Sequence, residues 1–323
     1  MTSEIERTTR FSFYLPAAVT AVLFIGVQIL ALLIVPQYRS FGYQAFGPQG
    51  QTNPFIPLIY VAVLIIFTAI MIYILKKNKG NLLRAFFIFV ISLSAIYVLF
   101  PLFILALPSL PNTAFLLSVA VMIAIGAALW RYPEWYVVDT WGFIMASGIT
   151  AIFGISLGIL PAFVLLAAMA AYDFIAVYRT KHMLDVAEGA LDLNLPIMLM
   201  VPRRSGFSNF NRYDAKTIRS DEPVQRDALY IGLGDMIIPG VLTISAFSNL
   251  PQNVIAAGFT GNLLVAAGCI VGALSGFLIL MMQTSKGRAQ AGLPFLNTGT
   301  ILGFLISYML VFHNFGFGFV FNL

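Results

Sequence analysis

Apolar residues gather along the chain in nine long runs that short polar segments separate. Each run has the length of an α-helix that crosses a bilayer core of about 30 Å at about 1.5 Å per residue. The pattern therefore predicts an all-α integral membrane protein with nine transmembrane helices. The predicted helices occupy residues 14–35, 54–75, 85–107, 113–129, 137–156, 159–178, 228–247, 254–283 and 293–312.

Composition agrees with this pattern. Of 323 residues, 60% are hydrophobic and only 10% are charged, and the mean hydropathy is +0.92, which excludes an ordinary soluble domain. The formal net charge of +5 could suggest a nucleic-acid partner, but the basic residues punctuate the apolar runs. No small-residue cleavage site follows the first run, which is therefore interpreted as an anchor. We expect a multi-pass protein of the cell membrane that binds no nucleic acid.

The basic residues between the runs also predict an orientation. If the amino terminus is cytoplasmic, all of the 18 Lys and Arg residues except Arg39 fall on the cytoplasmic side. Such a bias is the usual signal for membrane topology. The sequence thus predicts a cytoplasmic amino terminus and a carboxyl terminus outside.

Three segments follow from this layout. Residues 1–179 hold the first six predicted helices, residues 180–227 form a long cytoplasmic loop, and residues 228–323 hold the last three. The loop contains an apolar piece at 195–202 that is too short to span a membrane. A strand, an interfacial helix and a mobile plug are all open interpretations of this piece. The middle of the loop is expected to be disordered.

Two acidic residues, Asp173 and Asp235, lie well inside apolar runs. An ionised Asp at membrane depth costs about 2.5–3.5 kcal/mol on insertion scales, so such residues usually have a function. Gly232-Leu233-Gly234 immediately precede Asp235. Glycines remove side-chain bulk, which lets another helix or an extended peptide backbone come close.

The two acids are expected to meet. Asp173 lies six residues before Arg179, and Asp235 lies eight residues after Asp227, at the predicted cytoplasmic ends of consecutive helices. At the helical rise these distances place the carboxylates roughly 9 and 12 Å below the same surface.

Two neighbouring carboxylates are expected to share one proton. The ionised member can then take a proton from a water that attacks a peptide carbonyl, while the protonated member donates to the carbonyl oxygen. This chemistry needs no cofactor. The single cysteine, Cys269, and the distant His182 and His313 suggest no metal site. Spacing and depth fit equally well a cation- or proton-coupled transporter, and they also allow a leak channel or a structural hydrogen bond.

Three short motifs, in order along the chain, resemble those of the presenilin and signal peptide peptidase family, named YD, GxGD and PAL. The matching residues are Tyr172-Asp173, Gly232-Leu233-Gly234-Asp235 and Leu293-Pro294-Phe295-Leu296. Phe295 stands where the family has alanine, so the third match is partial. The nine-helix layout and the long loop between the sixth and seventh helices are also similar to the family.

The resemblance implies an intramembrane aspartyl endopeptidase with Asp173 and Asp235 as its catalytic pair. Tyr172 would shape the site, Gly232 and Gly234 would admit the substrate backbone, and Pro294 would keep the first turn of the ninth helix open. The other motif residues would also line or shape the site; they are Leu233, Leu293, Phe295 and Leu296.

The substrates that the resemblance implies are transmembrane segments of membrane proteins in the lipid bilayer, cut without a cofactor. The orientation resembles the presenilin branch, and the compact chain resembles a prokaryotic, archaeal member that needs no accessory subunits. The oligomeric state is left open. A transmembrane helix must unwind before hydrolysis, and its freed backbone groups need partners in lipid. A strand at 195–202 or 224–230 could supply them by pairing with the substrate.

Overall fold

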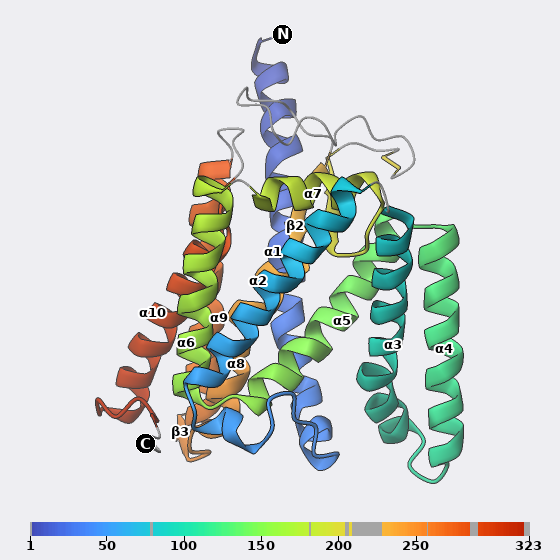
Figure 1. Cartoon of the computed structure of the whole chain (residues 1–323). Coiled ribbons are helices and arrows are strands. Elements are labelled where there is room, and N and C mark those ends of the chain that lie inside the picture. The colour runs from blue at the N-terminus through green and yellow to red at the C-terminus, as the bar shows by residue number, and fades with distance from the viewer. Residues whose placement is uncertain are drawn as a thin grey trace.

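Ten α-helices and two short β-hairpins make up the part of the chain that the computed structural model describes, which is residues 2–77, 80–180, 182–203, 207–208, 228–256, 258–284 and 290–319. The helices are α1 (Thr2–Ser40), α2 (Phe55–Lys76), α3 (Gly80–Ala106), α4 (Pro111–Arg131), α5 (Trp135–Ser156), α6 (Ile159–Phe174), α7 (His182–Asp192), α8 (Leu233–Asn249), α9 (Gly261–Thr284) and α10 (Leu293–Phe312). The remaining elements are the 3₁₀ turn η1 (Pro48–Gln51), the π-helical turn η2 (Ile175–Arg179) and the strands β1 (Met198–Pro202), β2 (Ala228–Gly232), β3 (Val254–Ala256) and β4 (Phe259–Thr260). The long helices form one bundle (Figure 1).

Among the described residues, eight helical segments are long and apolar enough to cross a membrane. They are α1 from Leu15 onward, α2 to α5, α6 together with η2, α9 and α10. The prediction of a helical membrane protein is therefore confirmed at this level. The remaining predicted helix, at 228–247, corresponds to α8, which has only 17 residues.

Two of the nine apolar runs do not begin as helices, and the prediction was wrong there. Residues 228–232 form β2, which pairs with β1, and α8 begins only at Leu233. The run at 254–283 opens with the β3–β4 hairpin, and α9 begins only at Gly261. A short apolar stretch can form either a buried strand or part of a helix, and its sequence pattern does not distinguish the two. Here each stretch forms a strand because a partner strand pairs with it.

Helix α8 lies inside the bundle, in contact with α1, α5, α6, α9 and α10. Its middle residues are buried on all sides, as expected for a helix that is surrounded by protein. Two polar side chains on it find partners there: the Thr243 hydroxyl donates to Gln28 Oε1 of α1 at 2.7 Å, and the Ser245 hydroxyl donates to the Leu157 carbonyl at 2.9 Å. These bonds satisfy side chains that burial would otherwise leave without water or a partner.

Helices α9 and α10 pack with their backbones in close contact. A Cβ atom added at Gly272 would lie 2.2 Å from the Gly299 carbonyl oxygen, and one at Gly268 would lie 2.3 Å from the Ser307 side chain. The four-residue spacing of these α9 glycines is therefore a helix-packing motif, and it fixes α10 against the rest of the bundle.

The predicted loop at 180–227 is partly structured. Helix α7 lies across one end of the bundle (Figure 1). Its Val186 and Ala190 pack with Met71 of α2 and Leu83 of α3. Of the three interpretations of the apolar piece at 195–202, the strand is correct, since residues 198–202 form β1. The expected disorder in the middle of the loop concerns residues that lie outside the described part of the chain.

Candidate active site

Asp173 lies in the last turn of α6 and is buried, with 7% of its surface exposed. Its Oδ2 accepts a hydrogen bond of 3.0 Å from the backbone N–H of Leu293, the first residue of α10. That N–H is available because the first backbone donors of a helix have no intrahelical acceptor. The start of α10 therefore fixes the orientation of the Asp173 carboxylate.

Asp235 lies in the first turn of α8, directly after β2. A Cβ atom added at Gly292 would lie 3.1 Å from Asp235 Oδ2 and 3.3 Å from its Cγ, so the two residues are in close contact. Gly292 immediately precedes Leu293, the donor to Asp173. The two carboxylates, which belong to helices far apart in the chain, thus converge on one short segment, Gly292-Leu293.

A π-helical turn follows Asp173 and holds the segment before α10. The hydroxyl of Tyr178, in η2, donates to Gln290 Oε1, and the backbone N–H of Ala291 donates to the same Tyr178 oxygen at 3.4 Å. Residues 290–293 are therefore held by α6 and η2 at two points, Tyr178 and Asp173. Single π-helical turns are frequent at functional sites.

The hairpin β1–β2 leads the chain to Asp235 in a fixed register. Its strands are antiparallel, with Met198 opposite Gly232, and the pairing continues because the Leu233 N–H donates to the Ile197 carbonyl at 3.1 Å. Backbone N–H groups along an antiparallel strand point alternately toward and away from the partner strand. The Leu233 N–H points toward Ile197, the residue just before β1, so the N–H of Gly232 points away from β1.

A family model described as signal-peptide peptidase, presenilin aspartyl protease matches residues 21–313. The chain belongs to this family of aspartyl proteases. Two solved structures, each described as a presenilin family intramembrane aspartate protease, are similar to it. One, in a C222 space group, has a TM-score of 0.65 and 30% identity, covering 91% of this chain and 99% of the other. The second, in a P2 space group, has a TM-score of 0.62 and 31% identity, covering 90% and 96%. No curated protein sequence matches the chain.

Family membership decides between the functions that the spacing of the acids left open. This presenilin-family protein is an intramembrane aspartate protease and a multi-pass integral membrane protein, and its substrates are transmembrane proteins within a membrane. The resemblance that the three motifs indicated is thereby confirmed at the level of the family.

Of the two glycines in the GxGD segment of this protease, Gly234 borders open space. A Cβ atom at Gly234 would meet no atom within 4 Å, and Gly234 is exposed. A Cβ atom at Gly232 would lie 3.6 Å from Asp235 Oδ2, which is ordinary contact. The backbone at Gly234, the residue before Asp235, is therefore open to the approach of another peptide, while Leu233 between the glycines packs against the core.

Three residues of the partial PAL match pack into the hydrophobic core next to the site. Phe295 and Leu296 pack in a core cluster with Met236 of α8, whereas Leu293 packs in the neighbouring core cluster. Pro294 occupies the first turn of α10, where its missing N–H is tolerated.

Tyr172 of the YD pair reaches toward α2. Its hydroxyl donates to Thr68 Oγ1 at 3.4 Å. Tyr172 therefore ties the end of α6, which carries Asp173, to a neighbouring helix.

No sequence pattern singled out Gly292 or Tyr178, which the structure places at the site. Their contacts depend on how α10 meets α6 and α8, and a single sequence does not show such an arrangement. Among the described residues, no group of three or more His, Cys, Asp or Glu side chains is placed to hold a metal ion.

Proposed function

We propose that this protease hydrolyses peptide bonds within transmembrane segments, with Asp173 and Asp235 as its catalytic dyad and a water as the nucleophile. The observation that supports this most strongly is the convergence of both carboxylates on Gly292-Leu293. Groups from three helices, α6, α8 and α10, meet there toward the end of the bundle where α7 lies (Figure 1).

The dyad carries one proton in this mechanism. The ionised carboxylate removes a proton from the water, which attacks the carbonyl carbon, while the protonated carboxyl donates to the carbonyl oxygen. A tetrahedral intermediate results. The dyad then returns a proton to the departing amine as the C–N bond breaks, and no cofactor takes part. Leu293 orients Asp173, and the open side at Gly234 admits the peptide.

The substrate approaches as an added strand. A helix hides its carbonyls in hydrogen bonds, so the segment around the cut must be extended, and its backbone groups then need partners in lipid. The Gly232 N–H points away from β1 and lies three residues before Asp235, which makes the outer edge of β2 a suitable partner.

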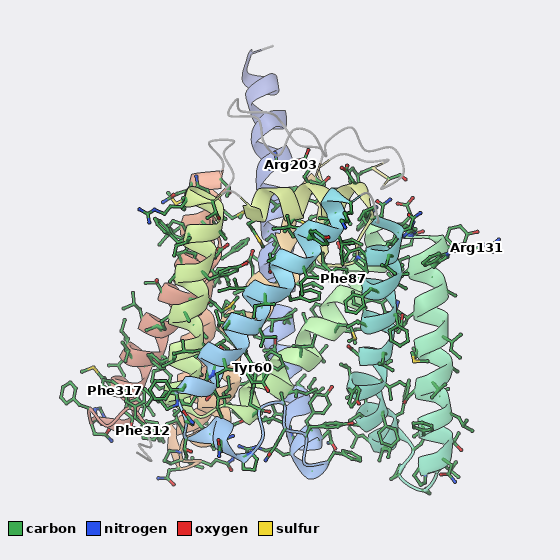
Figure 2. All side chains as sticks on the ribbon, viewed as in Figure 1. Tyr60, Phe87, Arg131, Arg203, Phe312 and Phe317 are labelled. Carbon is green, nitrogen blue, oxygen red and sulfur yellow. The ribbon has the colours of Figure 1, made fainter. Side chains whose placement is uncertain are left out.

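The full topology has nine spans, with α8 as the seventh. Its 17 residues and the five of β2 together cover about 40 Å at the usual rises of helix and strand, enough to cross a bilayer. The amino terminus is cytoplasmic and the carboxyl terminus is outside. In support, Figure 2 shows Arg131 and Arg203 toward the end of the bundle near α7, and Phe312 and Phe317 toward the other end. Substrates have their amino terminus outside, and no accessory subunit is required.

The dyad is tested by purifying the protein in detergent and following cleavage of a labelled transmembrane peptide. Wild type should cleave, whereas Asp173→Asn and Asp235→Asn should each be inactive because a shared proton needs two titratable groups. Both variants should remain folded, with thermal stability unchanged or higher, since Asn is nearly isosteric and removes a buried charge. Retention of more than a few per cent of activity by either variant would exclude this dyad.

A further inference from the structure

Helix α5 carries a third buried carboxylate, Asp139, which the proposed mechanism does not use. Only 9% of its surface is exposed. Its Oδ1 accepts a hydrogen bond of 2.8 Å from the backbone N–H of Met200, in the middle of β1. A carboxylate in an apolar segment is costly to bury, so a bond between it and a strand calls for a specific role.

The bond occupies the edge of β1 that faces away from β2. The Met200 N–H points outward, away from β2, because it donates to Asp139 of α5. Backbone nitrogens alternate in direction along an antiparallel strand, so those of Met198 and Pro202 also point outward. Pro202 has no N–H to donate. Asp139 therefore holds one of only two outward donors of β1, which leaves this edge poorly suited to pairing with another strand.

A second contact joins the same face of α5 to the hairpin. Gly142 lies three residues after Asp139, and a Cβ atom there would lie 2.6 Å from Leu199 Cδ2 and 3.1 Å from Leu233 Cδ2. Residues three apart share a helix face, so Asp139 and Gly142 form one contact surface for β1. Leu233 lies two residues before Asp235, so the contact of Gly142 with Leu233 links this surface of α5 to the position of Asp235.

We propose that Asp139 is a positioning residue of the protease. By holding the outer edge of β1, it fixes the hairpin so that the edge of β2 faces the substrate, and it sets the register in which a peptide bond arrives at Asp235. This inference rests on the strand addition in the proposed function. Asp139 acts through β1 and touches neither the water nor the scissile bond.

The test compares Asp139→Leu, which has no acceptor, with Asp139→Asn, which keeps an acceptor oxygen. Thr140→Leu is the matched control, because Thr140 is exposed on the same helix and its hydroxyl donates to the Tyr136 carbonyl one turn earlier. The kinetic constants are measured on a labelled transmembrane peptide, and the cut positions are mapped by mass spectrometry.

Asp139→Leu should raise KM about tenfold, change kcat less, and spread the cuts over neighbouring bonds, because the loss of the hydrogen bond weakens the hold on β1. Asp139→Asn should stay within about twofold of wild type because its amide oxygen can still accept from Met200, and Thr140→Leu should match wild type. Wild-type KM and cut positions in Asp139→Leu, or equal defects in the Asn and Leu variants, would overturn the proposal.

If Asp139→Leu does not fold, Asp139→Glu replaces it. The extra methylene keeps the acceptor but displaces β1, so the cut positions should shift, and an unchanged pattern would overturn the proposal. Failure of the dyad is recognised separately, by cleavage in Asp235→Asn. Failure of strand addition is recognised by normal cleavage in Gly232→Pro.

Discussion

At the scale of residues, Gly292 and Leu293 place the two acids in one site. Leu293 donates to Asp173, and Gly292 lies against Asp235 without a side chain between them. In the proposed mechanism, the chemistry then depends on one acid being ionised while the other is protonated.

The pH dependence of cleavage follows from this requirement. Activity should fall at low pH, where both acids are protonated and the base is lost, and at high pH, where both are ionised and the acid is lost. The rate profile should therefore be bell-shaped. Initial rates measured in one detergent across acidic to alkaline pH check this, and a monotonic profile would contradict the mechanism.

Gly234 offers a second test at this scale. Gly234→Leu should remove most activity, because its side chain would fill the open space at Gly234, where the proposed function has the substrate enter. The fold should tolerate it, since nothing lies within 4 Å of the added Cβ and Leu favours a helix more than Gly does. Cleavage rate and thermal unfolding are measured together, with Gly234→Ala as a smaller step. Normal cleavage by the Leu variant would show that the glycine serves only packing.

Which residues could be predicted from the sequence depends on how local their signal is. Asp173 and Asp235 stood out because acids are rare inside apolar runs. Gly292 and Tyr178 have no such local signal, since each acts through a contact with an element distant in the chain. Asp139 is an acid near the start of the run at 137–156, but its contact with β1 could not be predicted from a single sequence.

At the scale of elements, the hairpin β1–β2 changes how the site is built. The run at 228–247 has the composition of a continuous helix, yet its first five residues pair with Met198–Pro202. A short buried strand and a buried helix have similar hydrophobic patterns, so the sequence could not separate them. The depth of Asp235 is consequently set by a strand and one helical turn, rather than by the helix assumed at first.

Replacing Gly232 tests the edge of β2. Gly232→Pro should fit the backbone, because its φ of −64° suits proline and an extended residue precedes it. It should lower kcat/KM about tenfold or more, since it removes the outward N–H available to a substrate strand. Gly232→Ala, whose Cβ has ordinary contacts, is the control and should retain most activity. Equal activity of the two variants would argue against strand addition.

At the scale of the whole molecule, buried α8 and the surrounding helices hold the site near one end of the bundle. Asp173 lies close to the end of α6, Asp235 lies in the first turn of α8, and Leu293 begins α10. The helical layout was largely predictable, because apolar length and basic residues are strong signals for membrane segments. The packing order was not predictable, since it depends on contacts such as those between the glycines of α9 and α10.

This placement predicts where substrates are cut. A substrate helix beside the bundle spans the same bilayer, so its scissile bond should lie in the third of its hydrophobic segment nearest the cytoplasm. That end also unwinds most easily, because backbone groups near a helix terminus can reach water. A Gly there should raise the rate, and a Leu-rich end should lower it.

The most direct measurement is mass spectrometry of the products from a single-span substrate, reconstituted with the protease in bilayers of known orientation. Wild type should give cuts clustered in the cytoplasmic third, and Asp173→Asn and Asp235→Asn should give none. Cuts clustered in the outer third, or the same products from either variant, would contradict the placement and the chemistry of the dyad.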